Sequence, residues 1–464
     1  MTSGLVCAVW VSLYFGASHV PYRGWLPRFL WEIELKTVDL RFRFRDVREA
    51  NPAIVIVAFD QKSQDALGPW PLSRDIFAAA LNRLTAGGAR VVVFDIFFPR
   101  PDRFSGPRPA SRKEGTQSTS AISRAENPGC DDVKETLPTD TENDLKFARA
   151  LSCSKNAILG YYFYFSPREG NAEDEERRKM FVHYLSARAP FTEIVHPEYQ
   201  RRFDSDARGI LPDLPRLAEY AKGFGFCNAV GDSDGVMRRQ PLVVRYHGNY
   251  YSSLALAAAQ AYASPSHHGL GIVFNPQGAE AIKLQGVPIK TSSEGSVQVD
   301  FLGPAGTYPT YSLVDVLDGK IPVRVFGDKL VLVGATAPEI KDTVAVPFQP
   351  GGFPGVELHA NVVDNLLAGR FISRGPREFL IDIGLILLLG FAPAVLAVFM
   401  SPARASVLVL TLFLAFSWIA YFLFAHRQEW ISVVFPCHAL GFAYLAIAVQ
   451  AFMGGGAAKS GAQS

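Results

Sequence analysis

The stretch "RVVVFDIFFPRPD" (90–102) decides the fold, because it is an almost continuous apolar run that carries one carboxylate, Asp95, near its centre. A second run, "IVIVAFD" (54–60), is also apolar throughout and ends on Asp60. Short apolar runs rich in β-branched residues are typical of strands that are buried on both faces. The two runs therefore predict two buried strands, at 54–60 and 91–98, and each has an aspartate at or near its end.

The segment between these runs has the pattern of a helix. Its apolar residues recur at helical spacing over 76–84, Ser73 is placed to cap the helix start, and Gly87-Gly88 to end it. A strand, a helix and a strand in succession predict a βαβ unit with parallel strands. Similar patterns continue along the chain and predict an α/β fold with a mostly parallel central sheet flanked by helices. The further strands are expected at 156–165, 236–239, 242–246, 296–304 and 328–337, and the further helices at 143–151, 253–263, 311–320 and 356–370.

The C-terminal quarter has the composition of a membrane domain. Three apolar runs, 379–399, 405–424 and 431–453, each have about the 20 residues that a helix needs to cross a bilayer. A shorter apolar run at 5–20 is expected to be an uncleaved membrane anchor, with a cleaved signal peptide as the alternative. Together they predict an α-helical transmembrane bundle of four spans.

This pattern divides the chain into an anchor (1–21), a large domain (22–378), three spans (379–453) and a flexible cytoplasmic tail (454–464). Within the domain, 103–142 is rich in Ser, Pro, Gly and charge and is expected to be a disordered insertion. Four spans place both termini on one side of the membrane. The few basic residues near the spans favour the cytoplasm for the termini, so the domain is expected to be extracytoplasmic, on the inner membrane.

Charge and cysteine content narrow the function. A formal net charge of +2 over 464 residues, with no basic and aromatic patch, indicates no nucleic-acid partner. Of the five cysteines, Cys130 and Cys153 are a candidate disulfide in an oxidising compartment. The sequence holds none of the catalytic signatures of hydrolases, nucleotidases, metalloproteases or kinases, so no enzymatic role and no catalytic residue are predicted.

In an open parallel sheet, ligands bind at the carboxyl ends of the strands. Two aspartates and a small-residue turn, "GAT" (334–336), are expected at this edge, and an arginine in the loop "GPWPLSRD" is a natural ion-pair partner for a buried carboxylate. One interpretation is a site for a cation or a small polar ligand. The alternative is that each aspartate caps a helix or accepts hydrogen bonds from a loop. The candidate ligand-binding residues are Asp60, Arg74, Asp95, Gly334, Ala335 and Thr336.

Two other polar patterns are weaker. "GDSDG" (231–235) has the composition of half a calcium loop, but a tight turn is the favoured interpretation. Glu357, Asn361 and Asp364 share one face of the helix 356–370, and a solvated face is expected there. His359 lies off that face. Since no cysteine or histidine pair has ligand spacing, no metal site is predicted, and the cofactor is left undefined.

Several blocks, in this order, resemble the second type of CHASE domain, the sensory extracellular module associated with cyclases and histidine kinases. They are 39–45, 54–102, 223–244, 328–348 and 353–370. Residues that match the family motif without a proposed ligand role are expected to be structural. These are Trp70, Asp234, Gly235, Asp342, Gly355, His359 and Asn361.

The resemblance implies a membrane sensor that detects an extracytoplasmic signal and relays it to a cyclase or kinase partner, and it leaves a homodimer open. The usual cytoplasmic output domain has no counterpart in the sequence. Two alternatives therefore stand beside the sensor: the sensory part of a receptor cyclase or kinase whose catalytic domain is truncated or encoded separately, and a membrane assembly or docking protein.

Overall fold

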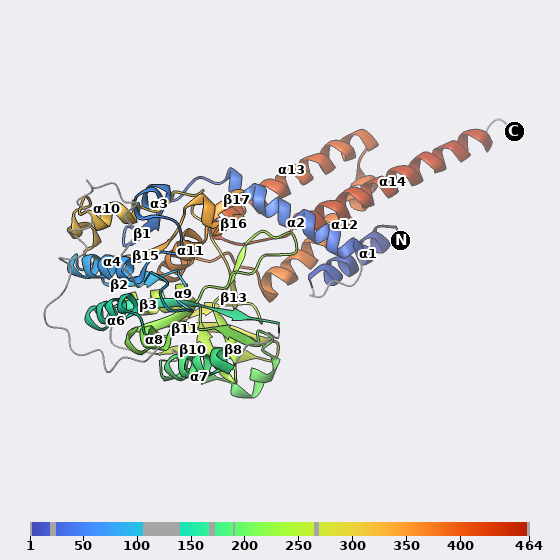
Figure 1. The fold of residues 1–464 in the computed structure, drawn as a ribbon. Coiled ribbons are helices and arrows are strands. Elements are labelled where there is room, and N and C mark those ends of the chain that lie inside the picture. Colours follow the sequence, from blue (N-terminus) through green and yellow to red (C-terminus); the bar gives the residue numbers. More distant parts are fainter. Residues whose placement is uncertain are drawn as a thin grey trace. The chain divides into compact units, whose positions relative to one another are not determined.

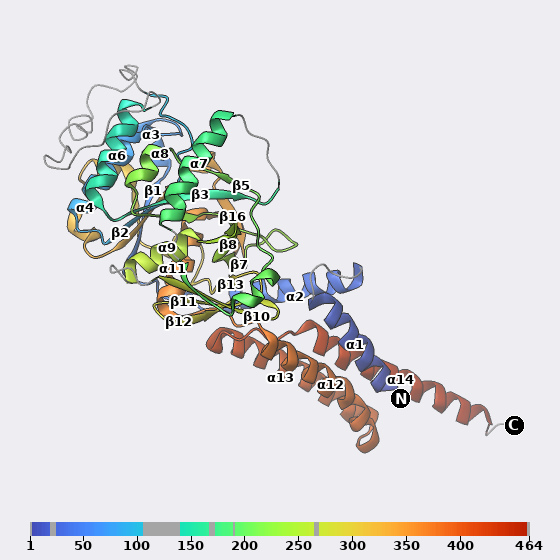
Figure 2. The same ribbon diagram turned by 90° about the horizontal axis from the view of Figure 1, so that it is seen from below.

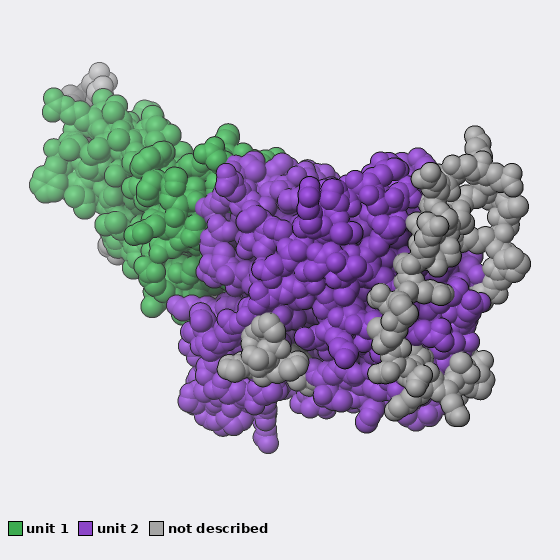
Figure 3. All heavy atoms as spheres, turned by 90° about the vertical axis from the view of Figure 1, so that its left-hand side faces the viewer, with its two compact units in different colours: residues 1–46, 371–464 green, residues 47–370 purple. Residues whose placement is uncertain are grey.

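The structure is a computed structural model, and it divides into two compact units, residues 1–46 with 371–464 and residues 47–370 (Figure 3). Most of the predicted insertion, including Cys130, lies outside the described residues, so its expected disorder and the Cys130–Cys153 bridge stay predictions. The structure describes residues 2–18, 25–104, 140–166, 172–188, 191–263 and 269–461.

The second unit is built on one large sheet whose central strands are parallel (Figure 1). The predicted strands at 54–60, 91–98, 156–165 and 328–337 all contribute to it, although the second ends early, at Phe94, and this confirms the α/β class. The last of them, β15, pairs with β1 on one side and β2 on the other. The order is β14 (Thr310–Ser312), β1 (Ile54–Phe59), β15 (Leu330–Ala335), β2 (Val91–Phe94), β3 (Ala157–Tyr164) and antiparallel β5 (Gly209–Leu211), with β6 (Gly223–Phe226) also paired to β3.

Helices cover both faces of this sheet, which is why its strands are apolar throughout (Figures 1 and 2). One face carries α4 (Arg74–Ala86), α6 (Glu142–Ser154) and α8 (Pro215–Tyr220), and the other carries α9 (Leu254–Ala263) and α11 (Gly355–Ala368). On the face covered by α4, α6 and α8, the strands and helices form one large buried core around Phe77, Phe94 and Phe147. The remaining helices of the unit are α3 (Gln61–Leu67), α7 (Ala172–Ala187) and α10 (Leu313–Leu317).

The helix α4 begins and ends where the sequence predicts, but its cap differs. Ser73 is the cap residue, yet its side chain makes no capping hydrogen bond. Instead, a carboxylate oxygen of Asp102 accepts hydrogen bonds from Arg74 N and Ser73 Oγ, both at 2.8 Å. The loop after β2 therefore fixes the start of α4, a contact that local sequence cannot reveal.

Smaller strand pairs complete the unit. The expected strand at 236–239 forms three residues later, as an edge strand limited by Pro241. The expected turn after 242–246 is confirmed, with positive φ at His247 and Gly248. A four-stranded sheet has the order β12 (Val287–Lys290), β11 (Gly278–Leu284), β10 (Leu270–Asn275) and β4 (Phe191–Val195), and the pairs are β7 (Arg239–Pro241) with β13 (Ser296–Gln298), β8 (Val243–Tyr246) with β9 (Asn249–Ser252), and β16 (Thr343–Val346) with β17 (Gln349–Pro354).

The first unit is helical. Three of its helices are long and apolar enough to cross a membrane, which confirms the three C-terminal spans. The N-terminal helix has 17 residues and is shorter than these spans. The second helix lies in a segment that the sequence pattern assigned to the large domain, whereas the compact α/β unit begins at Val47. The helices are α1 (Thr2–Ser18), α2 (Trp25–Phe44), α12 (Pro376–Phe399), α13 (Pro402–Arg427) and α14 (Val434–Gly461).

A buried polar network explains why α2 belongs to the helical unit. Glu34 of α2 is fully buried, and its carboxylate accepts hydrogen bonds from Ser432 Oγ and from the backbone N of Val433 and Val434, each at 2.9 Å. Arg41, about two turns further along α2, pairs with the same carboxylate at 3.1 Å. Two charges buried against the start of α14 hold α2 there.

Candidate functional site

The predicted edge of the sheet exists, but Asp60 has a structural role at it. Its Oδ1 accepts hydrogen bonds from Ser63 N at 2.9 Å, Ser63 Oγ at 2.7 Å and Ser312 Oγ at 2.7 Å. Asp60 is thus the N-cap of α3 and also ties that helix to the start of α10. These contacts match the capping alternative for this residue.

The strand register keeps Asp60 and Asp95 apart. Asp60 follows Phe59, which pairs with Ala335, whereas Asp95 follows Phe94, which pairs with Val333. The two aspartates are therefore separated by two strand spacings and by two residues along the strands. With strands about 4.8 Å apart and about 3.3 Å per residue, their backbones are about 12 Å apart. One small cation cannot be bound by both carboxylates across that distance.

The turn between them contacts protein rather than open space. The backbone N of Thr336 and of Ala337 both donate to Phe59 O at 3.0 Å. A Cβ atom at Gly334 would lie 2.6 Å from Val356 Cβ, so the glycine is needed for the close approach of α11 to β15. The small residues at 334–336 therefore serve the packing of a helix.

Arg74 lies elsewhere. Its guanidinium pairs with Asp144, with Nε and Oδ1 3.7 Å apart, donates to Arg100 O and stacks on the Phe98 ring. It thus helps to hold the loop after β2 against α4 and α6 rather than pairing with Asp60 or Asp95.

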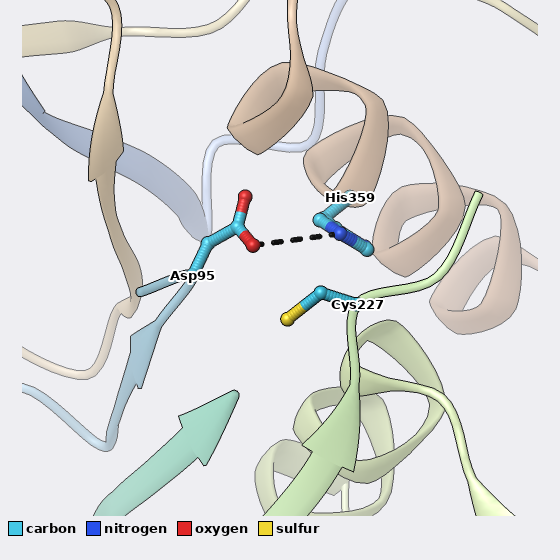
Figure 4. Close-up of side chains that lie close together, drawn as sticks. All are labelled: Asp95, Cys227 and His359. Carbon is cyan, nitrogen blue, oxygen red and sulfur yellow. Dashed lines mark ion pairs between the residues drawn. The ribbon is translucent and has the colours of Figure 1, made fainter. Parts of the chain in front are cut away.

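Asp95 instead meets two residues from other elements, Cys227 and His359, and Figure 4 shows the three side chains facing one another. Each offers one ligand-type atom, and these atoms all lie within 4.8 Å of one another. His359 Nε2 is 3.7 Å from Asp95 Oδ1. This cluster, named here the Asp95–Cys227–His359 cluster, is the site at the sheet edge with the residue types for metal or proton chemistry.

Rigid elements position all three residues. Asp95 N donates to Val333 O, and Cys227 N donates to Tyr161 O, each at 2.9 Å, so both backbones continue the hydrogen bonding of the sheet just past β2 and β6. His359 lies in the second turn of α11, where it is 3% exposed. Gly160 makes room for the thiol, because a Cβ there would lie 2.6 Å from Cys227 Sγ.

Negative charge surrounds the cluster. Burial and the nearby Asp95 carboxylate raise the pKa of the Cys227 thiol well above its usual value, and Asp213 and Asp342 add to this shift. Burial, followed by the charge of Asp95, raises the pKa of Asp342 to about 7. Burial raises the pKa of Asp213 to about 7 as well. Carboxylates in such an environment favour a proton or a cation nearby.

The remaining motif residues make turn and packing contacts. "GDSDG" is a turn, as predicted: Gly235 has a φ of 78°, and the buried Arg238 pairs with Asp232 at 3.0 Å and with Asp234 at 2.8 Å. Trp70 packs against Phe59 and Phe77. Gly355 has no room for a side chain, since a Cβ would lie 2.9 Å from Asp342 Oδ1.

The expectation of a solvated face on α11 is wrong. Glu357 is 3% exposed, and Asn361 and Asp364 are fully buried. Their side chains accept hydrogen bonds from loop backbones: Glu357 from Gly306 N and Thr307 N, and Asn361 from Leu302 N. The polar residues on this helix face bond to the backbone of irregular loops instead of to water. The sequence alone does not distinguish a buried polar face from a solvated one.

Cys227 is the site residue that the sequence pattern did not select. Its thiol is free. The available signal was its place directly after a strand, the same place that drew attention to Asp60 and Asp95.

The family comparison agrees with this fold. The family model described as "CHASE2 domain" matches residues 6–398, most of the chain. The chain belongs to the CHASE2 domain family. The comparisons with curated proteins and with solved structures found no match to this chain. The resemblance stated from the sequence blocks is thereby confirmed, and a CHASE2 sensory domain followed by three apolar helices is consistent with a membrane sensor.

Proposed function

We propose that this CHASE2 protein is an integral membrane sensor, which detects an extracytoplasmic cue with residues 47–370 and relays it across the membrane to a partner that carries the output. The family and the three apolar helices support this proposal. The sequence shows no catalytic signature of its own, so the partner would supply a cyclase or kinase activity.

One observation carries the relay. The α/β unit is flanked in the chain by α2, which ends at Phe44, and by α12, which begins at Pro376. Both helices bond to the same short segment before α14: Glu34 accepts from Ser432 Oγ, and Asp382 of α12 accepts from Ser432 N, each at 2.9 Å. A change in the spacing of the two chain ends of the domain would therefore strain one shared buried network.

A second contact set extends this network to the N-terminal helix. Tyr14 of α1 donates to Asp382 Oδ2 at 2.6 Å, and Arg374 donates to the same oxygen at 2.7 Å. Helix α1 has 17 residues, which at 1.5 Å each gives about 26 Å, close to the thickness of a bilayer core. It packs on α12 and α14 through Trp10 and Ala17, so we propose it as the fourth span, which leaves the domain outside.

Topology is tested with reporters in the full chain. Alkaline phosphatase inserted within 105–139 should be active and green fluorescent protein dark there, whereas fusions after 464 should show the opposite pattern. Active phosphatase at the C-terminus alone would overturn the proposed orientation.

The relay is tested through the partner. A photo-crosslinking residue in the segment 454–464 should capture a cyclase or kinase, and Glu34→Gln should change that partner's output while Glu32→Gln, a surface change on the same helix, should not. Capture of a non-enzymatic membrane complex with no output would favour the assembly protein. A cyclase or kinase encoded directly downstream would favour the split receptor.

A further inference from the structure

We propose that Asp95, Cys227 and His359 form a binding site for a divalent transition-metal ion, with zinc as the ion that the donor set fits best. This proposal concerns binding by the residues 47–370 and does not depend on the direction in which the chain crosses the membrane. The sequence spacing gives no sign of it, because Asp95 directly follows β2, Cys227 directly follows β6 and His359 lies in α11.

The geometry fits with small side-chain movements. With zinc–nitrogen and zinc–oxygen distances of about 2.0–2.2 Å and zinc–sulfur distances of about 2.3 Å, tetrahedral ligands lie about 3.3–3.7 Å from one another. His359 Nε2 and Asp95 Oδ1 are already 3.7 Å apart. The cluster's ligand atoms all lie within 4.8 Å, so the others need to move by about 1 Å.

His359 provides an independent indication. It is 3% exposed, and among the described residues its Nδ1 has no hydrogen-bond partner. Its Nε2 faces Asp95 at 3.7 Å, which is longer than a hydrogen bond. An ion between Nε2 and the carboxylate would give both of these atoms a partner, and Nδ1 would then carry the ring proton.

The surrounding charge favours a cation. Asp95, Asp213 and Asp342 all act on the Cys227 thiol. A dipositive ion would be attracted by these carboxylates and would release the thiol proton to solvent as the thiolate bonds to it. The backbone at Asp95 and Cys227 is fixed by the sheet, so the donors are held in place before the ion binds.

The donor types select the metal. A thiolate and an imidazole exclude magnesium and calcium, which take oxygen ligands. One sulfur, one nitrogen and one oxygen suit zinc, whose sites with three protein ligands keep a fourth position for water or another ligand. Neither Asp60 nor Arg74 belongs to this site.

The test uses the full chain without a polyhistidine tag, in detergent micelles, treated with a chelator and then titrated with cobalt(II) as a spectroscopic substitute for zinc. One equivalent should give tetrahedral visible bands and a thiolate charge-transfer band, and excess zinc should abolish both. Cys227→Ser should lose the charge-transfer band, and Asp95→Asn should weaken binding at least ten-fold. The matched control Asp60→Asn, at the neighbouring strand end, should bind like the wild type.

A second measurement does not depend on variants folding. Zinc should protect Cys227 of the wild-type chain from alkylation, as read by mass spectrometry, by more than ten-fold in rate, while leaving Cys7 and Cys437 unchanged. A charge-transfer band that persists in Cys227→Ser, or the absence of both cobalt binding and thiol protection in the folded wild type, would overturn the proposal and leave the cluster as a buried polar contact.

Discussion

Replacement of Asp60 separates a capping role from a ligand role. In Asp60→Ala, the N-cap acceptor of α3 and the hydrogen bonds to two serine hydroxyls are lost. The cap is worth about 0.5–2 kcal/mol. The hydroxyls of Ser63 and Ser312 are 2.9 Å apart and can bond to each other in the variant. The loss of their two hydrogen bonds to Asp60 therefore adds only about 1 kcal/mol. We expect α3 and α10 to be destabilised by about 1.5–3 kcal/mol in total.

Asp60→Asn keeps a neutral acceptor at the same place and removes only the charge, so about 1 kcal/mol is expected. The assay is hydrogen exchange followed by mass spectrometry on the full chain in detergent, with peptides that cover α3. A loss of 2 kcal/mol corresponds to about thirty-fold faster exchange where local opening controls the rate. Asp65→Asn, an exposed change on the same helix, should exchange like the wild type.

The reasoning fails if Asp60→Ala exchanges at the wild-type rate, because the three hydrogen bonds would then contribute nothing to the stability of α3. It also fails if Asp60→Asn and Asp60→Ala are equally destabilised, since the neutral acceptor would then have no effect.

Three further changes test other parts of the structure. Gly334→Ala should destabilise the chain by about 1–3 kcal/mol in urea unfolding, because its Cβ would lie 2.6 Å from Val356 Cβ, whereas Gly351→Ala, with no described atom within 4 Å of its Cβ, should not. Burial stabilises the protonated form of Asp213 and raises its pKa to about 7, so the stability of the wild type should fall as the pH rises from about 4 to 7. Asp213→Asn should remove this part of the pH dependence and be more stable than the wild type by about 2–4 kcal/mol at pH 8. Equal pH profiles of the two proteins would contradict the assignment. Glu34→Ala should lower the stability of the helical unit in detergent by about 3–5 kcal/mol, because it leaves the buried Arg41 without its carboxylate; an unchanged melting temperature would contradict the network.

The local sequence predicts the strands and helices of this fold better than it predicts which of them lie next to each other. The runs at 54–60 and 90–102 contain the parallel strands β1 and β2. Strands that are apolar throughout are covered on both faces, and such strands are typical of parallel sheets. The separation of β1 from β2 by β15 was not predictable, since pairing between strands more than 200 residues apart leaves no local pattern. The same holds for α2, whose charges Glu34 and Arg41 indicate a soluble helix until their buried partners are known.

The sequence predicts a site at the carboxyl edge of the sheet, and this stays a prediction. Asp95 does meet polar side chains there, but they are not the predicted ones. Its partners are Cys227, directly after β6, and His359 in α11, and neither has a cysteine or histidine at ligand spacing in the sequence. Asp60 carries the same sequence signal as Asp95, yet a helix begins directly after it and uses its carboxylate.

The central position of β15 also sets the order in which the chain can fold. Strands β1 and β2 are synthesised early, but neither can complete its hydrogen bonding until residues 330–335 have been made. The sheet therefore closes over a chain separation of about 240–280 residues, which makes its assembly slow. A short 3-10 turn, the β16–β17 pair and α11 are all that lie between β15 and the long apolar helix that begins at Pro376. We expect the sheet to remain open on the ribosome until the C-terminal helices are about to emerge, so this protein depends on protection of its unpaired strands during synthesis.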